Sequence, residues 1–133
     1  MSKEHLATFI FERAEGFGDL VALRRQIEGK WQETTYGTLV DQSRTIASAL
    51  LARGIGRRDR VGIFSANRPE WAITDLAILV AFGVSVPVYG TNTESQTKYI
   101  VDDAGIRILF VGDKRQLECA LPLLDSEGTL ELI

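Results

Sequence analysis

Apolar and polar positions along the chain separate an opening part from a later, repeating part. The runs Leu20–Gln26 and Lys30–Thr34 are rich in residues that favour strands, and they flank Glu28-Gly29. Two such runs around a two-residue turn are typical of a β-hairpin. The residues ahead of the hairpin, 1–16, mix glutamates among their apolar positions, which indicates a helix rather than a secretory signal.

A longer helix is predicted after the hairpin. Thr35 is a suitable N-cap, because apolar side chains then recur at helical spacing on one face. These are Leu39, Val40, Ile46, Ala47, Leu50 and Leu51. The pattern stops at Arg53, and Gly54 follows where a left-handed backbone is least costly for glycine. We therefore expect a helix over residues 35–53 with one buried face.

The rest of the chain has a regular period. Strand-like runs begin near Val61, Val84, Ile106 and Thr129, at separations of 23, 22 and 23 residues. Each interval has room for one helix, and consecutive strands joined in this way pair in parallel. The predicted fold class is therefore α/β, a layered and mostly parallel sheet with flanking helices and a short N-terminal hairpin.

Each helix of the repeating part has a candidate start. Pairs with the three-residue spacing of a capping box, or of variants of it, precede all three: Asn67 with Glu70, Thr93 with Gln96, and Asp113 with Gln116. The helix 69–82 is apolar nearly all round, so we expect it to be covered on both sides and to end at Gly83. The helix from 114 should bury Leu117, Ala120, Leu121 and Leu124, although a proline at 122 should break or end it early.

The last run, Thr129–Ile133, alternates apolar residues like a strand. A natural edge strand is usually protected by charge, proline or a following element, and Glu131 alone does so here. We interpret this end as a cut through a larger sheet.

Composition narrows the class of protein. The 133 residues carry a net charge of −3 and are 45% hydrophobic, which suits a globular domain and speaks against a basic surface for nucleic acid. The longest apolar stretch, Leu76–Val88, is interrupted by glycine, serine and proline and is shorter than the ~20 residues of a membrane span. The single cysteine, Cys119, excludes an internal disulfide and fits a reducing, cytoplasmic compartment.

Residue chemistry alone predicts no catalytic or metal-binding residue. The one histidine, His5, lies in the first predicted helix, and no serine stands in a G-x-S-x-G motif, so a hydrolase triad is excluded. Adjacent Asp102 and Asp103 would diverge by about 100° on a helix, which favours a pair between Asp102 and Lys98 over a metal site. The basic cluster at positions 53, 57, 58 and 60 suits a solvated turn better than a phosphate site.

Several stretches occur in the order and spacing of a known family. They are Thr35–Leu39, Arg60–Ile63, Asn67–Trp71, Gly83–Tyr89, Tyr99–Asp103 and Leu109–Asp113. Together they resemble adenylate-forming acyl-CoA synthetases, and the sequences NRPEW and VPVY are most similar to the long-chain fatty-acid ligases. The resemblance extends from about residue 7 to residue 133 and implies part of a larger N-terminal domain.

The resemblance implies an ATP-dependent ligase. Such enzymes turn a fatty acid and ATP into an acyl-adenylate and pyrophosphate, using Mg²⁺, and CoA then displaces AMP to give a thioester. The chain ends before the family's phosphate loop, its later nucleotide motifs and its C-terminal domain with the catalytic lysine. No catalytic residue is therefore carried over, the preferred acyl length is not predicted, and we expect the isolated segment to be inactive. A homodimer contact and a peripheral membrane contact are left open.

One loop is a candidate binding element. In related ligases the loop after the proline-bearing strand borders the CoA channel, and here it is Tyr89-Gly90-Thr91. Gly90 would permit a ligand to approach the backbone closely. The alternative is an ordinary turn that leads from a strand to the helix at Thr93. For the whole chain two further alternatives stay open: a free-standing α/β module that binds a nucleotide or CoA, and a fragment that associates with itself through the edge at 129–133.

Overall fold

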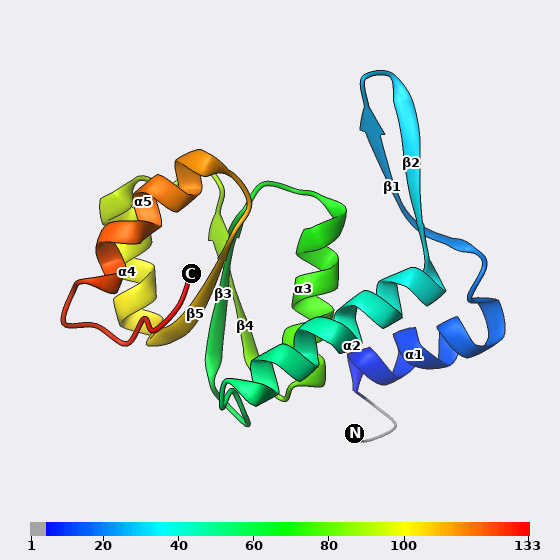
Figure 1. The fold of residues 1–133 in the computed structure, drawn as a ribbon, viewed down its shortest axis with the longest axis horizontal. Helices are drawn as coiled ribbons and strands as arrows, with labels where there is room; N and C mark the ends of the chain where they lie inside the picture. The colour runs from blue at the N-terminus through cyan, green and yellow to red at the C-terminus, as the bar shows by residue number, and fades with distance from the viewer. Residues whose placement is uncertain (1–4) are drawn as a thin grey trace. The chain divides into compact units, whose positions relative to one another are not determined.

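The computed structural model describes residues 5–133, which form two compact units (Figure 1). The first unit contains the chain up to Gly54 together with Arg68–Ala81. The second contains Ile55–Asn67 together with Phe82–Ile133. The first four residues of the predicted N-terminal helix lie outside the described part of the chain.

The first unit begins with a helix and a hairpin, as predicted. Helix α1 spans Leu6–Phe17, and strands β1 (Val21–Ile27) and β2 (Lys30–Thr35) pair antiparallel. The turn residues Glu28 and Gly29 both have positive φ, 49° and 77°, which is the backbone of a type I′ turn. That turn matches the twist of the strands, so the hairpin prediction is confirmed.

Helix α2 (Tyr36–Ala52) starts and ends as its sequence predicts. Thr35 Oγ1 accepts a hydrogen bond from the Thr38 amide at 3.2 Å, and Gly54 adopts a φ of 76° after the last turn. Its buried face packs against α1 and α3 (Pro69–Val80). The apolar cluster formed there contains Ala7, Leu39, Ile73 and Leu76.

Helix α3 begins at Pro69, as predicted, but its cap and its C-terminal end differ from the prediction. Asn67 does not cap it, because Arg68 is extended (φ −160°, ψ 160°) and makes no side-chain cap hydrogen bond. A residue before proline is driven out of the helical region, so Pro69 must open the helix. At the other end Phe82, and not Gly83, takes the positive φ of 61°. None of residues 71–81 is exposed.

The second unit is a parallel sheet with two helices on one face (Figure 1). Strands β3 (Arg60–Ser65), β4 (Val84–Tyr89) and β5 (Ile106–Val111) pair in the order β4-β3-β5. Helices α4 (Glu94–Ala104) and α5 (Lys114–Leu124) pack on it. The α/β prediction is confirmed. The core contains Phe64, Val88, Val101, Ile106, Leu109, Ala120, Leu123 and Leu130.

The starts of α4 and α5 differ in one informative way. Thr93 and Gln96 form the predicted capping box, with both reciprocal hydrogen bonds present. Asp113 caps α5 by accepting from the Gln116 amide at 2.8 Å. The side chain of Gln116 is instead buried and bonds to two glycines, Gly90 and Gly112.

Two expectations for α5 are wrong. Pro122 lies inside the helix, which continues to Leu124. A proline this close to the end removes one backbone hydrogen bond from the last turn, where the helix is nearly complete. The buried face is Gln116, Ala120 and Leu123, whereas the predicted Leu117, Leu121 and Leu124 are exposed.

The predicted strand over 129–133 is reduced to one bridge. Leu132 pairs in parallel with Ile108 of β5, and the amides of Leu109 and Glu131 complete the contact with bonds to Leu132 and Arg107 carbonyls. The segment therefore lies beside β5, as a fourth parallel strand would, but without a continuous ladder.

Candidate functional site at the carboxyl edge of the parallel sheet

The carboxyl ends of the three strands meet at one edge of the second unit. Ser65, the last residue of β3, pairs with Tyr89, the last of β4, and Phe64 pairs with Val111, the last of β5. Ligands of open parallel sheets bind outside this edge. The segments that leave it, 66–67, 90–92 and 112–113, are the natural place to look for a site.

Gln116 joins two of these segments. Its side chain reaches the edge from the first turn of α5, and the residue is only 2% exposed. Oε1 accepts a hydrogen bond from the Gly112 amide at 3.0 Å, and Nε2 donates to the Gly90 carbonyl at 3.1 Å. The loop after β4 and the loop after β5 are thereby held to one side chain.

Arg115 holds the same loop from outside. Its guanidinium donates to the carbonyls of Gly90 and Asn92, the latter at 3.3 Å, and lies 5.9 Å from the centre of the Phe64 ring. The Gly90 carbonyl oxygen thus accepts from two side chains, one buried and one exposed. The backbone of the loop 90–92 is fixed by α5.

Gly90 is a glycine because protein surrounds its Cα. A Cβ built there would lie 2.8 Å from the Ala66 nitrogen and 3.0 Å from the Ser65 carbonyl carbon, distances that side chains do not tolerate. At Gly112 a Cβ would lie 2.7 Å from the Ser65 Cβ. The close approach expected of Gly90 is therefore made by β3 in this structure, and its role toward a ligand stays a prediction.

The three predicted loop residues differ in exposure. The side chain of Tyr89 is 83% exposed at the end of β4, Thr91 is exposed, and Gly90 is half-buried between them. Tyr89 and Thr91 are accessible to a ligand, whereas Gly90 fixes the backbone that carries them.

The other candidate residues have structural roles. His5 caps α1, with Nδ1 accepting from the Ala7 amide at 3.3 Å. Arg60 donates from Nε to the Ala104 carbonyl at 2.8 Å, so the basic cluster is not free for phosphate at that position. Lys98 and Asp102 form the predicted pair at 2.5 Å. Cys119 is half-buried against the core of the second unit.

Residues 5–133, the described part of the chain, were searched for metal-binding groups and for membrane-spanning helices. No group of three side chains there is arranged to hold a metal ion. No helix in that range is long and apolar enough to cross a bilayer.

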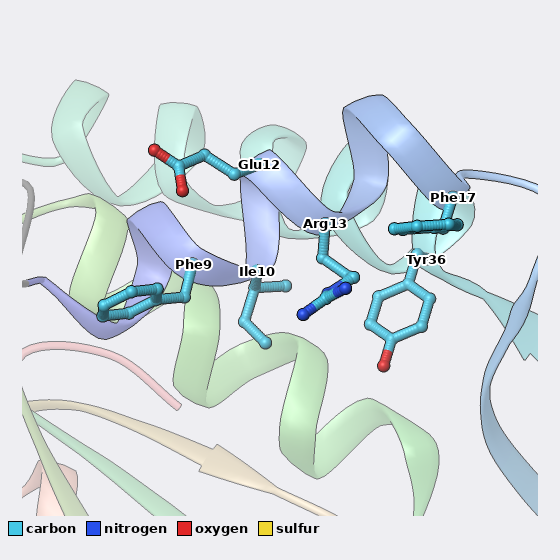
Figure 2. Close-up of a pocket in the computed structure, with 6 residues that line it drawn as sticks. All are labelled: Phe9, Ile10, Glu12, Arg13, Phe17 and Tyr36. Atoms are coloured by element: carbon cyan, nitrogen blue, oxygen red, sulfur yellow. The ribbon is translucent and has the colours of Figure 1, made fainter.

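A groove on α1, in the first unit, has a volume of about 410 Å³. Figure 2 shows the Arg13 side chain beside Phe17 and Tyr36, while Glu12 points to the other side of the helix. The Arg13 guanidinium lies 5.4 Å from the centre of the Phe17 ring, a cation–π distance. The groove brings together no nucleophile and base, so it offers no catalytic chemistry.

The carboxyl groups with shifted pKa values belong to ion pairs and not to a reactive centre. A hydrogen bond from Arg68 lowers the pKa of the Glu70 carboxyl. A hydrogen bond from Arg107 lowers the pKa of Glu131, and the same contact raises the pKa of Arg107. The two carboxylate side chains are more than half exposed, and the arginine partner explains the shift of each pKa.

Comparison with known families decides the assignment. The family model described as AMP-binding enzyme matches residues 10–132. The chain belongs to the AMP-binding enzyme family. Among curated members, it is 37% identical over 107 residues to the long-chain-fatty-acid–CoA ligase FadD15 of Mycobacterium bovis, covering 80% of this chain and 18% of that protein. It is 33% identical over 107 residues to the mouse ligase ACSBG2, covering 80% of this chain and 16% of that one.

Solved structures of this family show the same fold. A putative long-chain-fatty-acid CoA ligase from Rhodopseudomonas palustris matches 97% of this chain and 32% of its own, with a TM-score of 0.83 and 22% sequence identity. The chain spans 18% and 16% of the length of the two curated relatives given above. The predicted family is confirmed, and the fold is that of the corresponding region of adenylate-forming enzymes.

Sequence reasoning missed Gln116 and Arg115. The spacing of Gln116, three residues after Asp113, suggests only the reaching partner of a cap. The signal that distinguishes it is its register: Gln116 lies four and seven residues before Ala120 and Leu123, the two buried apolar residues of α5. A polar residue on that face must find hydrogen-bond partners inside the fold.

Proposed function

We propose that the chain forms the N-terminal scaffold portion of an ATP-dependent long-chain fatty acid–CoA ligase. The match to the family model over residues 10–132 carries the proposal. Its relatives by sequence are named as long-chain-fatty-acid–CoA ligases, and the chain spans 16–18% of the length of the two compared above. A segment of that size supplies part of an enzyme, so we expect it to be inactive by itself.

The chain's own contribution is positional. In the complete ligase, ATP and Mg²⁺ supply the activation of the fatty acid as an acyl-adenylate, and CoA accepts the acyl group. Among residues 5–133, no group of three His, Cys, Asp or Glu side chains could hold a metal ion. We assign residues 5–133 no chemical step. Their role is to hold the carboxyl edge of the sheet as one wall of the path that CoA takes.

Tyr89 and Thr91 are the residues we assign to that wall. Both are exposed on a loop whose backbone is fixed by Arg115 and Gln116. An exposed aromatic ring on a rigid backbone offers a flat contact at little conformational cost. A cytoplasmic location is part of the same proposal, and the single cysteine supports it because it fits a reducing compartment. A homodimer and a peripheral membrane contact stay predictions.

Two measurements test the proposal. The isolated chain, given ATP, Mg²⁺ and palmitate, should release no pyrophosphate, and release above the rate of a heat-denatured sample would contradict the scaffold role. A full-length ligase that carries this chain as its N-terminal segment should form palmitoyl-CoA. Failure of that ligase to form the thioester, with its folding verified, would count against the assignment to this enzyme.

The channel wall has a test of its own in the same ligase. Tyr89→Ala should raise KM for CoA by about tenfold, the effect of losing about 1.4 kcal/mol of contact, without changing the rate of adenylate formation. Tyr99→Ala is the matched control, because Tyr99 on α4 is also an exposed tyrosine, at 69%. An equal effect of both substitutions, or no effect of Tyr89→Ala, would remove the loop from the CoA path.

A further inference from the structure

We propose that Gln116 is the positioning residue of the loop Tyr89–Thr91, acting through the Gly90 carbonyl. The inference rests on the proposed function, because it gives that loop a place in CoA binding. Gln116 itself touches no substrate in this assignment. It sets where Tyr89 and Thr91 lie when CoA arrives.

The two partners of Gln116 require an amide. The Gly112 amide can only donate, and the Gly90 carbonyl can only accept. The side chain therefore needs an acceptor and a donor on one planar group, at 3.0 Å and 3.1 Å from its two neighbours. Glutamate offers the acceptor but, when ionised, sets a carboxylate oxygen against the Gly90 oxygen. Leucine offers neither.

Burial makes this contact matter more than that of Arg115. Gln116 is 2% exposed, so a group left unpaired at its position has no water to replace the lost bond. Arg115 is exposed, and water can take over its bonds to the Gly90 and Asn92 carbonyls. Water therefore cannot replace the hydrogen bond from the Gln116 side chain to the Gly90 carbonyl.

The neighbouring helix supplies a comparison within the same fold. Gln96 holds the equivalent third position of α4, and its Oε1 accepts from the Thr93 amide at 3.0 Å on the exposed surface. That bond needs only an acceptor, so glutamate can replace Gln96. Gln116 has the same residue type and the same position in its helix, but its side chain is buried and joins two loops.

The first experiment uses the chain itself. Amide hydrogen exchange of Gly112 and Asn92 is measured for the unsubstituted chain, Gln116→Glu and the control Gln96→Glu. The Asn92 amide donates to the Tyr89 carbonyl within the loop, at 2.9 Å. Near neutral pH, Gln116→Glu should lower its protection by about tenfold, the equivalent of one lost buried hydrogen bond, whereas Gln96→Glu should leave it unchanged. The Gly112 amide is the internal reference, because it also donates to the Phe64 carbonyl and keeps a carboxylate acceptor in Gln116→Glu. Equal protection of Asn92 in all three chains would overturn the proposal.

A pH series separates hydrogen bonding from packing. In Gln116→Glu the introduced carboxyl can donate to the Gly90 carbonyl once it is protonated, so protection should recover as pH falls toward the ordinary carboxyl value of about 4.3. Gln116→Leu, which fills similar space, should show no such recovery. Recovery in both variants, or in neither, would contradict a role through the amide donor.

The second experiment places the loop in function. In a full-length ligase that carries this chain, Gln116→Glu should raise KM for CoA about tenfold above pH 7, with adenylate formation unchanged, and Gln96→Glu should alter neither. Loss of protection in the chain without a change in KM would leave Gln116 as the loop's anchor but contradict the CoA channel, and so the proposed function of the loop. Normal protection would overturn the anchor itself. If Gln116→Glu slowed adenylate formation as well as thioester formation with CoA, the defect would be a general structural one. That result would likewise contradict the positioning role.

Discussion

Arg107 on β5 holds the carboxylate of Glu131 in a two-pronged ion pair. Nε lies 2.8 Å from Oε1, and Nη2 lies 3.0 Å from Oε2. The third guanidinium nitrogen, Nη1, lies 2.9 Å from Asp59 Oδ2, and that carboxylate also accepts from the Gly56 amide. One arginine therefore connects the segment at 129–133, the sheet and the turn before β3.

This pair predicts an acid-sensitive contact. The hydrogen bond from Arg107 lowers the pKa of Glu131 in the folded chain, so the pair stabilises the segment above the unfolded carboxyl value of about 4.3 and loses its effect as pH falls through the lowered pKa. Amide exchange of Leu109 and Glu131, which bond to carbonyls across this contact, should accelerate in that acid range relative to amides between β3 and β4. In Glu131→Gln that relative change should vanish, and a persistent one would assign it to another group.

A buried hydroxyl is expected to stabilise the first unit. Ser43 Oγ lies 2.7 Å from the Leu39 carbonyl and 3.0 Å from the Ile73 carbonyl, so it connects α2 to α3. Ser43→Ala should lower the free energy of unfolding by about 1 kcal/mol in urea titrations. Ser48→Ala is the control in the same helix, because Ser48 makes the same bond to the carbonyl four residues earlier but is exposed. It should be neutral or slightly stabilising, since alanine favours helices. Equal losses would point to a helix effect alone.

Packing predicts that alanine substitutions at two glycines of the second unit change stability in opposite directions. At Gly90 an added methyl group would meet the backbone of Ser65 and Ala66, which lie too close and cannot move as a flexible side chain does. Gly90→Ala should therefore cost about 1–3 kcal/mol of stability. At Gly56 nothing lies within 4 Å of the added atom, so Gly56→Ala should be neutral or stabilising by up to about 1 kcal/mol. Thermal unfolding of both variants decides the matter, and a stable Gly90→Ala would show that the loop shifts easily.

The sequence predicts elements better than side-chain roles. Strand starts, the hairpin turn and the cap at Thr93 follow from local chemistry, because each depends on residues a few positions apart. Helix α3 begins at Pro69 as predicted, but Asn67 does not cap it, because a residue before proline is driven out of the helical region and Arg68 is extended. The side chain of Gln116 could not be placed from sequence, since its partners Gly90 and Gly112 meet only when the strands are assembled.

The buried face of α5 differs from the face that the sequence pattern predicts, and the difference can be tested by substitution. The spacing of apolar residues in α5 predicts that Leu117 and Leu121 lie in the core. In the structure Leu121 is 47% exposed, whereas Leu123 is 3% exposed and belongs to the core cluster. The helix is turned this way because Gln116, Ala120 and Leu123 share the face toward the sheet. Leu123→Ala should therefore destabilise the chain by about 2–5 kcal/mol, and Leu121→Ala by about 0.5 kcal/mol or less, in urea unfolding followed by circular dichroism. Both substitutions replace leucine with alanine in the same helix, so the change in helix propensity is the same. The difference in lost stability then reports the difference in burial. The reverse order of losses would restore the face that the sequence pattern predicts.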